Sequence, residues 1–422
     1  MVCTSNAPDV VDYLLLTLTS QGPIVRITPN EIHFEDPDFN DVLFPSLGRR
    51  KVDRPGYAAA RAGSSDMRYR LVLAPGSIVA TAEHDVHRRR RNALNSFFSG
   101  ASVRRLEPIL QEHMDKILNR MQKSGLRSEV VELHHMFKAC ASDIITRYAF
   151  GDTFGFMDQP DYGQSYFRAG EAFNSMTHVF GAFPWLLTIA TSVPGWLFKY
   201  LNPDMTEFVD RREWWIEKVR EIRDSKDPER AKNTIFGGIL DSSLPAEEKT
   251  DQRLANEAQL VVFAGEGTTG EKSIAIQLNV NKVLTLVLEA HTLTSAIFHL
   301  LIKPEILQKV KDELKAVVTD KRPIPTFQQL DKLHYTNAVI NEAIRLHPGA
   351  MHRQARGVEI TLARRELAAT LATIFVKYDL YRGQPGPTLE LYETIRARDI
   401  DADRDYITPL PTKGSMGLRV EN

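Results

Sequence analysis

Small residues followed by two threonines form the first string that could do chemistry. It runs from Val262 to Thr269 and includes Ala264, Gly265, Glu266 and Thr268. Glycine weakens a helix but lets a ligand lie against the backbone. Threonine hydroxyls in such a stretch can interrupt helical hydrogen bonds and carry protons. A simple Gly-Thr helix end or turn would explain the same string, so both interpretations stay open.

A carboxylate and a guanidinium are spaced three residues apart in the string Asn341–Pro348. Glu342 and Arg345 therefore share one face of a helix. If they are exposed, they form a common surface ion pair worth about 0–1 kcal/mol. If they are buried, a bidentate pair could fix a neighbouring loop.

Four consecutive arginines end a third string, His84–Arg91, which also contains His87. The run wraps around a helix, so only some of the guanidinium groups can face inward. It predicts either a solvated basic face or a site for anionic groups such as carboxylates. No aromatic residues interleave with the run and the net charge is -1, which argues against a nucleic-acid partner.

The chain has only two cysteines, Cys3 and Cys140. Their separation excludes a disulfide framework and a cysteine-based metal cluster, so no metal-ligand set is predicted. Cys140 lies within Phe137–Asp143, a helical pattern in which a cysteine is typically a small buried apolar residue.

Mainly helical elements must position these strings. Strand patterns at Ile24–Ile27 and Glu31–Phe34 flank a turn and predict a hairpin. Apolar residues at helical spacing and capping signals then predict helices over Val103–Met121, Val130–Tyr148, Ala246–Val261, Tyr335–Leu346 and Leu362–Tyr378, with a capping box at Thr326–Gln329. The predicted class is mainly α with a minor β part, as a single domain over residues 1–422.

Together, the three strings resemble the cytochrome P450 family, and in particular fungal haem-thiolate monooxygenases. Gly22–Glu31 resembles the family's first sheet, and Val262–Thr269 resembles its long oxygen-binding helix. Glu342 and Arg345 resemble the family's Glu-x-x-Arg structural pair.

The resemblance implies roles for individual residues. Thr268 would relay protons to iron-bound oxygen, with Glu266 as the nearby acid, because Gly267 occupies the position where the family usually has one. Arg91 would contact the haem propionates, and His87 stands where the family has a tryptophan. Ala264 and Gly265 would lie against the cofactor.

Two departures from the family pattern divide the chain. Residues 271–291 form an atypical insertion, and the segment that should follow Arg356, including the loop with the haem-binding cysteine, is missing. The predicted parts are a β-containing region (1–75), a helical core (76–356) and a C-terminal helix and tail (357–422). The expected P450-like fold is therefore incomplete and lacks the axial cysteine.

The resemblance implies a haem-dependent monooxygenase that hydroxylates or epoxidises an apolar secondary-metabolite precursor, terpenoid or polyketide-like. Electrons would come from an NADPH-dependent reductase. Two alternatives stay open: a catalytically inactive truncated remnant, and a haem-free binding protein.

The family resides at the endoplasmic reticulum membrane, but no apolar run of about 20 residues opens this chain. The uncharged stretch 179–198 is interrupted by Pro184 and Pro194, which break a spanning helix. We therefore expect a cytoplasmic or peripheral membrane protein, with possible membrane contact through 179–198.

Overall fold

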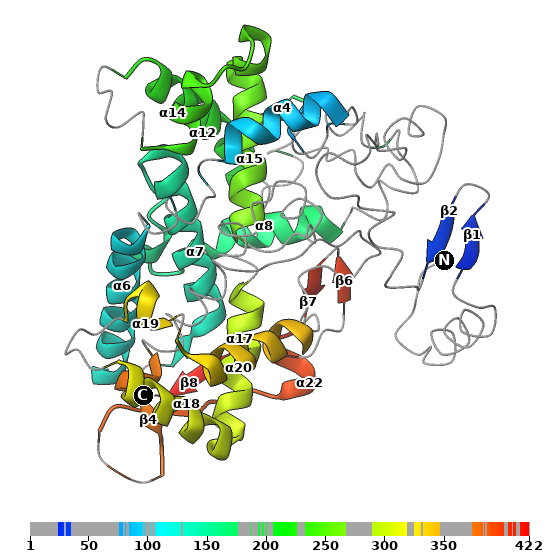
Figure 1. Cartoon of the computed structure of the whole chain (residues 1–422). Coiled ribbons are helices and arrows are strands. Elements are labelled where there is room, and N and C mark those ends of the chain that lie inside the picture. Colours follow the sequence, from blue (N-terminus) through cyan, green and yellow to red (C-terminus); the bar gives the residue numbers. More distant parts are fainter. Residues whose placement is uncertain are drawn as a thin grey trace.

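The computed structural model describes most of residues 76–175, 206–266, 289–346 and 374–421, the hairpin strands at 24–34 and a few residues between 186 and 200. Helices dominate this part of the chain (Figure 1). The longer ones are α4 (His84–Asn95), α6 (Glu107–Leu126), α7 (Leu133–Phe150), α8 (Gln164–Ser175), α12 (Thr206–Arg223), α14 (Ile235–Asp241), α15 (Asp251–Glu266), α17 (Glu289–Ile302), α18 (Pro304–Val317) and α20 (His334–Leu346). Shorter helical pieces are η4 (Phe156–Asp158), η6 (Ala246–Lys249), α19 (Phe327–Leu330) and α22 (Arg396–Asp399).

The β part consists of two hairpins and one small mixed sheet. The predicted hairpin is confirmed as β1 (Ile24–Thr28) and β2 (Glu31–Phe34), which pair antiparallel with Ile24 opposite Phe34. The sheet has the order β3-β8-β5-β4, in which only β4 and β5 are parallel. Its strands are β3 (Val131–Glu132), β8 (Arg419–Glu421), β5 (Thr388–Leu391) and β4 (Asp379–Leu380), and a second hairpin joins β6 (Arg404–Tyr406) to β7 (Thr408–Leu410). The predicted mainly α class is confirmed.

Most of the predicted helices form, with corrected boundaries. The one expected over Val130–Tyr148 starts later because Val131–Glu132 pairs with β8 instead. The one expected over Ala246–Val261 is broken: η6 ends at Lys249, Thr250 is extended, and α15 begins at Asp251. Of the helix predicted over Leu362–Tyr378, only Ile374–Tyr378 lies within the described residues; Ile374–Lys377 is helical and Tyr378 is not.

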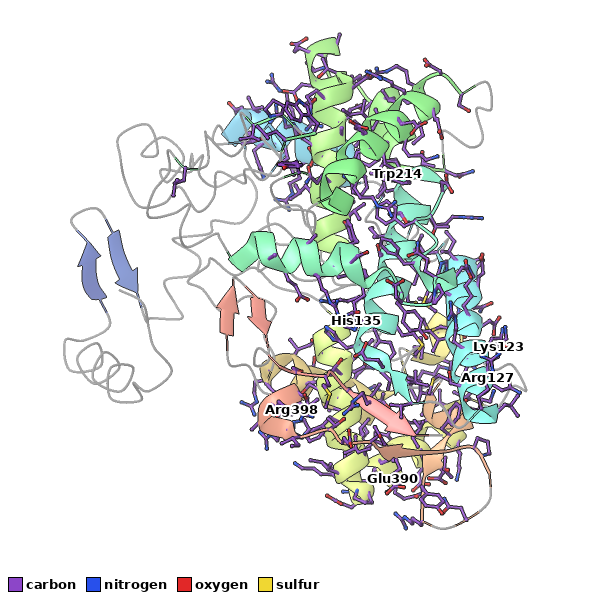
Figure 2. All side chains as sticks on the ribbon, turned by 180° about the vertical axis from the view of Figure 1, so that it is seen from behind. Lys123, Arg127, His135, Trp214, Glu390 and Arg398 are labelled. Carbon is purple, nitrogen blue, oxygen red and sulfur yellow. The ribbon has the colours of Figure 1, made fainter. Side chains whose placement is uncertain are left out.

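Helix α7 lies at the centre of the described fold. It packs against α6, α14, α15 and α17, and only His135 and Arg147 of its residues are not buried. Its start is capped by Glu132, which accepts hydrogen bonds from the backbone N–H groups of His134 and His135. Aromatic rings fill the space between α7, α12 and α14; Phe150 stacks on Phe236 and meets the edge of Trp214, which Figure 2 labels on α12.

A buried carboxylate joins α7 to the segment that follows it. Asp143 is fully buried and accepts hydrogen bonds from the N–H groups of Phe156 and Met157, at 3.0 and 2.8 Å. Its charge is thus held by two donors of η4, which fixes the path of the chain after α7.

We expect Asp143→Ala to destabilise the fold, because it leaves both buried N–H groups without an acceptor. Each unsatisfied group costs about 1–3 kcal/mol, so the free energy of unfolding should fall by about 2 kcal/mol or more. Urea denaturation measures this. The control Asp158→Ala removes only a partly exposed ion pair with Lys116, worth up to about 1 kcal/mol. Equal losses in both variants would contradict the assignment.

His113 makes the stability of α6 sensitive to acid. Its ring is buried and hydrogen-bonded to the Ile109 carbonyl at 2.8 Å, while Nε2 has no partner within the described residues. Burial lowers the pKa of His113 below its usual value of 6.5, although the Ile109 carbonyl and Asp143 partly offset this.

The unfolded chain therefore binds this proton more readily than the folded chain. Stability should be fully present above pH 6.5 and should decline as the pH falls below that value toward the lowered pKa. In His113→Leu this part of the decline should disappear, whereas the exposed control His334→Leu should retain it. Thermal unfolding across this pH range is the measurement, and identical pH profiles for wild type and His113→Leu would refute the assignment.

Candidate functional site

The arginine run lies on helix α4, where its members have different surroundings. Arg88 and Arg89 are exposed, whereas Arg90 and Arg91 are partly buried. Arg90 donates from Nε and Nη2 to the two carboxylate oxygens of Glu248, at 2.7 and 2.8 Å, and from Nη1 to Thr81 Oγ1 at 2.6 Å. All three of its nitrogens are therefore used, and Arg90 is not available to a ligand.

Arg91 differs from its neighbour. Its Nε is buried and has no hydrogen-bond partner among the residues that the structure describes. Burial lowers the pKa of this guanidinium, which nevertheless stays protonated at any physiological pH. His87 lies one turn earlier on the same helical face and is also partly buried. A partly buried cation in this state can bind an anionic group.

Glu248 belongs to a larger group of alternating charges that sequence reasoning missed. Arg253 Nε lies 3.1 Å from Glu248 Oε2, and Arg253 Nη2 lies 2.7 Å from Glu257 Oε2. The fully buried Glu257 also accepts from the backbone N–H of Ile78 at 3.1 Å. The group therefore joins α4, the end of η6, the start of α15 and the turn before α4.

The pKa values of the two carboxylates in this group are shifted in opposite directions. Burial by itself raises the pKa of Glu248, but the hydrogen bonds and charge of Arg90, together with the charge of Arg253, outweigh it and hold that pKa below its usual range. Burial also raises the pKa of Glu257, and there the arginine charges only partly offset the effect. The difference follows from the complete burial of Glu257 and from Arg90, which donates hydrogen bonds to Glu248 and none to Glu257.

The small-residue string lies at the end of α15. Ala264 and Gly265 are in its last turn and Glu266 is its final residue, whereas Thr268 lies outside the described residues. The next described element, α17, begins at Glu289, so residues 289–291 of the predicted insertion are helical. Both α15 and α17 pack on α7, above and below one another in Figure 1.

Glu342 and Arg345 do pair on α20. Arg345 donates from Nε and Nη2 to the two oxygens of Glu342, at 2.7 and 2.6 Å. Their side chains are 56% and 67% exposed, respectively, so this is a solvent-exposed ion pair in the described part of the chain. The structure does not bring this pair together with Arg91 or Glu266 through any described contact.

The described cysteine does not lie at this site. Cys140 lies on α7 without a disulfide bond, is 4% exposed and belongs to the hydrophobic core. No group of three or more His, Cys, Asp or Glu side chains within the described residues could hold a metal ion. Cys3 lies outside those residues.

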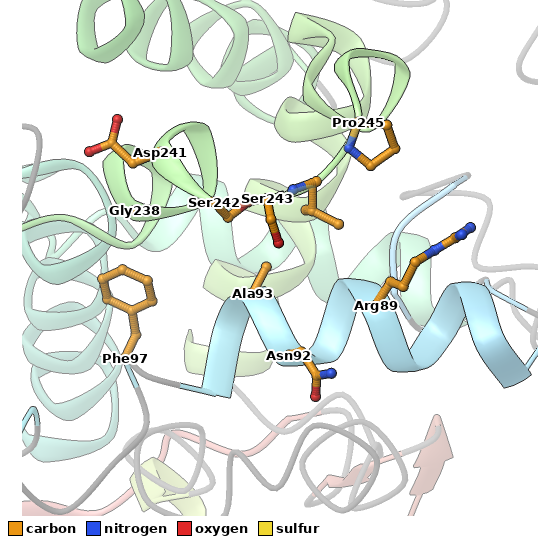
Figure 3. A pocket seen from close by; sticks show the side chains of 10 residues that line it. Arg89, Asn92, Ala93, Phe97, Gly238, Asp241, Ser242, Ser243 and Pro245 are labelled. Carbon is orange, nitrogen blue, oxygen red and sulfur yellow. Dashed lines mark hydrogen bonds between the residues drawn. The ribbon is translucent and has the colours of Figure 1, made fainter.

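A pocket of about 450 Å³ lies between α4 and the loop after α14 (Figure 3). Arg89 and Asn92 come from α4, and Asp241 and Ser242 come from the opposite wall. Phe97 packs so closely on Gly238 that any side chain there would collide with its ring. Arg91 is not among the ten described residues that line the pocket, so this pocket and the unpaired guanidinium are separate features.

Comparison with known proteins places these features in a family. A cytochrome P450 family model matches residues 52–275 and 289–365, and the residues between the two matches lie inside the predicted insertion. The tryptophan 6-hydroxylase fscE of Fusarium equiseti is 31% identical over 335 residues, which cover 79% of this chain and 60% of that protein. The cytochrome P450 monooxygenase TRI4 of Fusarium sporotrichioides is 30% identical over 342 residues, covering 79% and 59%.

A longer alignment, at 28% identity over 470 positions, covers 94% of this chain and 84% of the cytochrome P450 monooxygenase oblB of Aspergillus clavatus. In the first two alignments the chain spans about 60% of the length of the curated relatives. The family match covers well over half of the sequence, including α4, α15 and α20. The chain therefore belongs to the cytochrome P450 family.

Proposed function

We propose that this chain is a haem-dependent monooxygenase, as its family implies. Its substrate is an apolar secondary-metabolite precursor, terpenoid or polyketide-like, which it hydroxylates or epoxidises. The observation that carries the proposal is Arg91 on α4, a partly buried cation whose Nε has no partner among the described residues. Haem is the family's cofactor, and when bound with a thiolate ligand it supplies reductive activation of O₂. Electrons come from an NADPH-dependent reductase.

The residues fit one end of this cofactor. Haem carries two propionate carboxylates, and a guanidinium binds a carboxylate through charge-assisted hydrogen bonds. Arg91 supplies that guanidinium, and His87 on the same helical face supplies a second polar ring. Ala264 and Gly265 have no long side chains, so the last turn of α15 lets a flat ligand approach its backbone. Glu266 and Thr268 carry protons to the reaction site, and the Glu342–Arg345 pair is structural.

The residues do not fit the iron end. Haem-thiolate chemistry would need a cysteine of this chain as iron ligand, but Cys140 is enclosed in the hydrophobic core on α7. With two cysteines in the chain, only Cys3 is left as a source of thiolate. This observation favours the second candidate function, a catalytically inactive remnant or a haem-free binding protein that keeps the fold of the family.

The reduced, carbon monoxide-bound absorption spectrum separates these functions. Monooxygenase activity requires thiolate ligation, which gives a characteristic Soret band. A band of this kind that persists in Cys140→Ala and vanishes in Cys3→Ala would identify Cys3 as the ligand and support the monooxygenase. Haem bound without that band would support the inactive remnant. Complete absence of a haem band would leave the haem-free binding protein, and an apolar ligand should then raise the melting temperature.

Membrane contact is proposed to be peripheral and to involve residues 179–198. Most of this stretch lies outside the described residues, but Trp196 is 72% exposed and the nearby Tyr200 is 81% exposed. Such side chains favour the boundary between lipid headgroups and acyl chains. Among the helices that the structure describes, none has the length and apolar character needed to cross a bilayer.

We expect Trp196→Ser with Tyr200→Ser to reduce binding to phosphatidylcholine vesicles severalfold, because the two exposed rings are lost from the contact. Vesicle flotation measures the bound fraction. The matched control Tyr381→Ser removes another half-exposed aromatic residue and should bind like the wild type. Unchanged flotation of the double variant would show that the contact does not use these residues.

A further inference from the structure

We propose that Arg90 and Glu248 are positioning residues that set the orientation of helix α4 and thereby present the Arg91 guanidinium to a ligand carrying carboxylates. The proposal rests on the proposed function only for the identity of that ligand, a porphyrin with propionate groups. The orientation of α4 is a property of the protein alone and can be tested without any ligand.

The contact between Arg90 and Glu248 has the geometry of a strong ion pair. Two nitrogens of one guanidinium donate to two oxygens of one carboxylate, and the two side chains are 14% and 12% exposed. Such a bidentate contact fixes the orientation of the guanidinium relative to the carboxylate as well as the distance between them, whereas a single hydrogen bond fixes mainly the distance. The third contact, from Arg90 Nη1 to Thr81 Oγ1, joins the same side chain to the turn before α4.

Glu248 is itself held in place from the opposite side. Arg253 contacts both Glu248 and Glu257, and Glu257 is anchored by the Ile78 N–H with no exposure to solvent. Arg253 and Glu257 are both on α15, the helix whose other end carries Ala264, Gly265 and Glu266. The orientation of α4 is therefore defined relative to α15.

Helix geometry connects this ion pair to Arg91. Consecutive residues of an α-helix point about 100° apart, so the direction of Arg90 determines the direction of Arg91. Among its larger contacts with other described helices, α4 packs on the short helix α14. Leu94 buries the C-terminal half of α4 in the core, and the paired hydrogen bonds of Arg90 fix the rotation of the helix at the position next to Arg91.

The first experiment measures hydrogen exchange of the α4 amides in the full chain, without ligand. Arg90→Lys keeps the charge but cannot form the bidentate contact, and Glu248→Gln keeps the shape but removes the charge. In both variants exchange in α4 should become about tenfold faster while α6 stays unchanged. The control Arg89→Lys alters an exposed arginine of the same helix and should match the wild type. Wild-type exchange in α4 of both variants would overturn the proposal.

The second experiment tests whether Arg90 acts through Arg91. The probe is protoporphyrin IX, which has the two propionates and no iron, so its binding does not depend on a thiolate. Arg90→Lys should weaken binding about tenfold in the wild-type background and have no further effect in an Arg91→Gln background. Equal losses in both backgrounds would show a general structural role and overturn the proposal.

The two experiments also separate this proposal from the proposed function. If the wild-type chain does not bind protoporphyrin IX, the assigned ligand class is wrong and the proposed haem function fails with it. The exchange measurement then still decides whether Arg90 and Glu248 orient α4.

Discussion

Helix α7 is buried on nearly every side, and its polar groups must therefore be satisfied inside the protein. Its start is capped by Glu132, Asp143 accepts two backbone N–H groups, and Lys138 pairs with Glu171 at 2.5 Å. Each of these partners belongs to a different segment, so satisfying α7 also places β3, η4 and α8. The helices that carry the candidate site, α15 and α17, then pack on the same buried helix.

The charged group around Glu248 follows a different energetic rule from the apolar core. Burying charges is costly, and a buried ion pair often adds little net stability compared with apolar residues. Removing one partner, however, would leave an uncompensated buried charge. The intact group is therefore constrained to positions in which every charge keeps its partner. The alternation of Arg90, Glu248, Arg253 and Glu257 is therefore better understood as a device for orientation than as a source of stability.

Local patterns in the sequence were enough to predict the elements that depend on local physics. The hairpin at Ile24–Phe34, helix α20 and the capping box at Thr326–Gln329 were predicted, and in that box Thr326 and Gln329 exchange hydrogen bonds. The extended Thr250 was missed because no proline or glycine stands between Ala246 and Leu254 to signal a break in the helix. The pairing of Arg90 with Glu248 could not be predicted, since 158 positions separate the two residues and neither carries a local signal. The spacing of Glu342 and Arg345 predicted their contact but left open whether it would be buried, because exposure depends on the surrounding tertiary structure.

Helices α15 and α17 each pack on α7, on either side of the chain between Glu266 and Glu289. Because each helix has its own contacts with α7, the covalent connection is not what keeps the two in place. The entropy lost by closing a connection rises only with the logarithm of its length, by about 0.6 kcal/mol for each doubling. Insertions or deletions of codons between these two helices should therefore change the free energy of folding only slightly, while the packing around α7 stays the same.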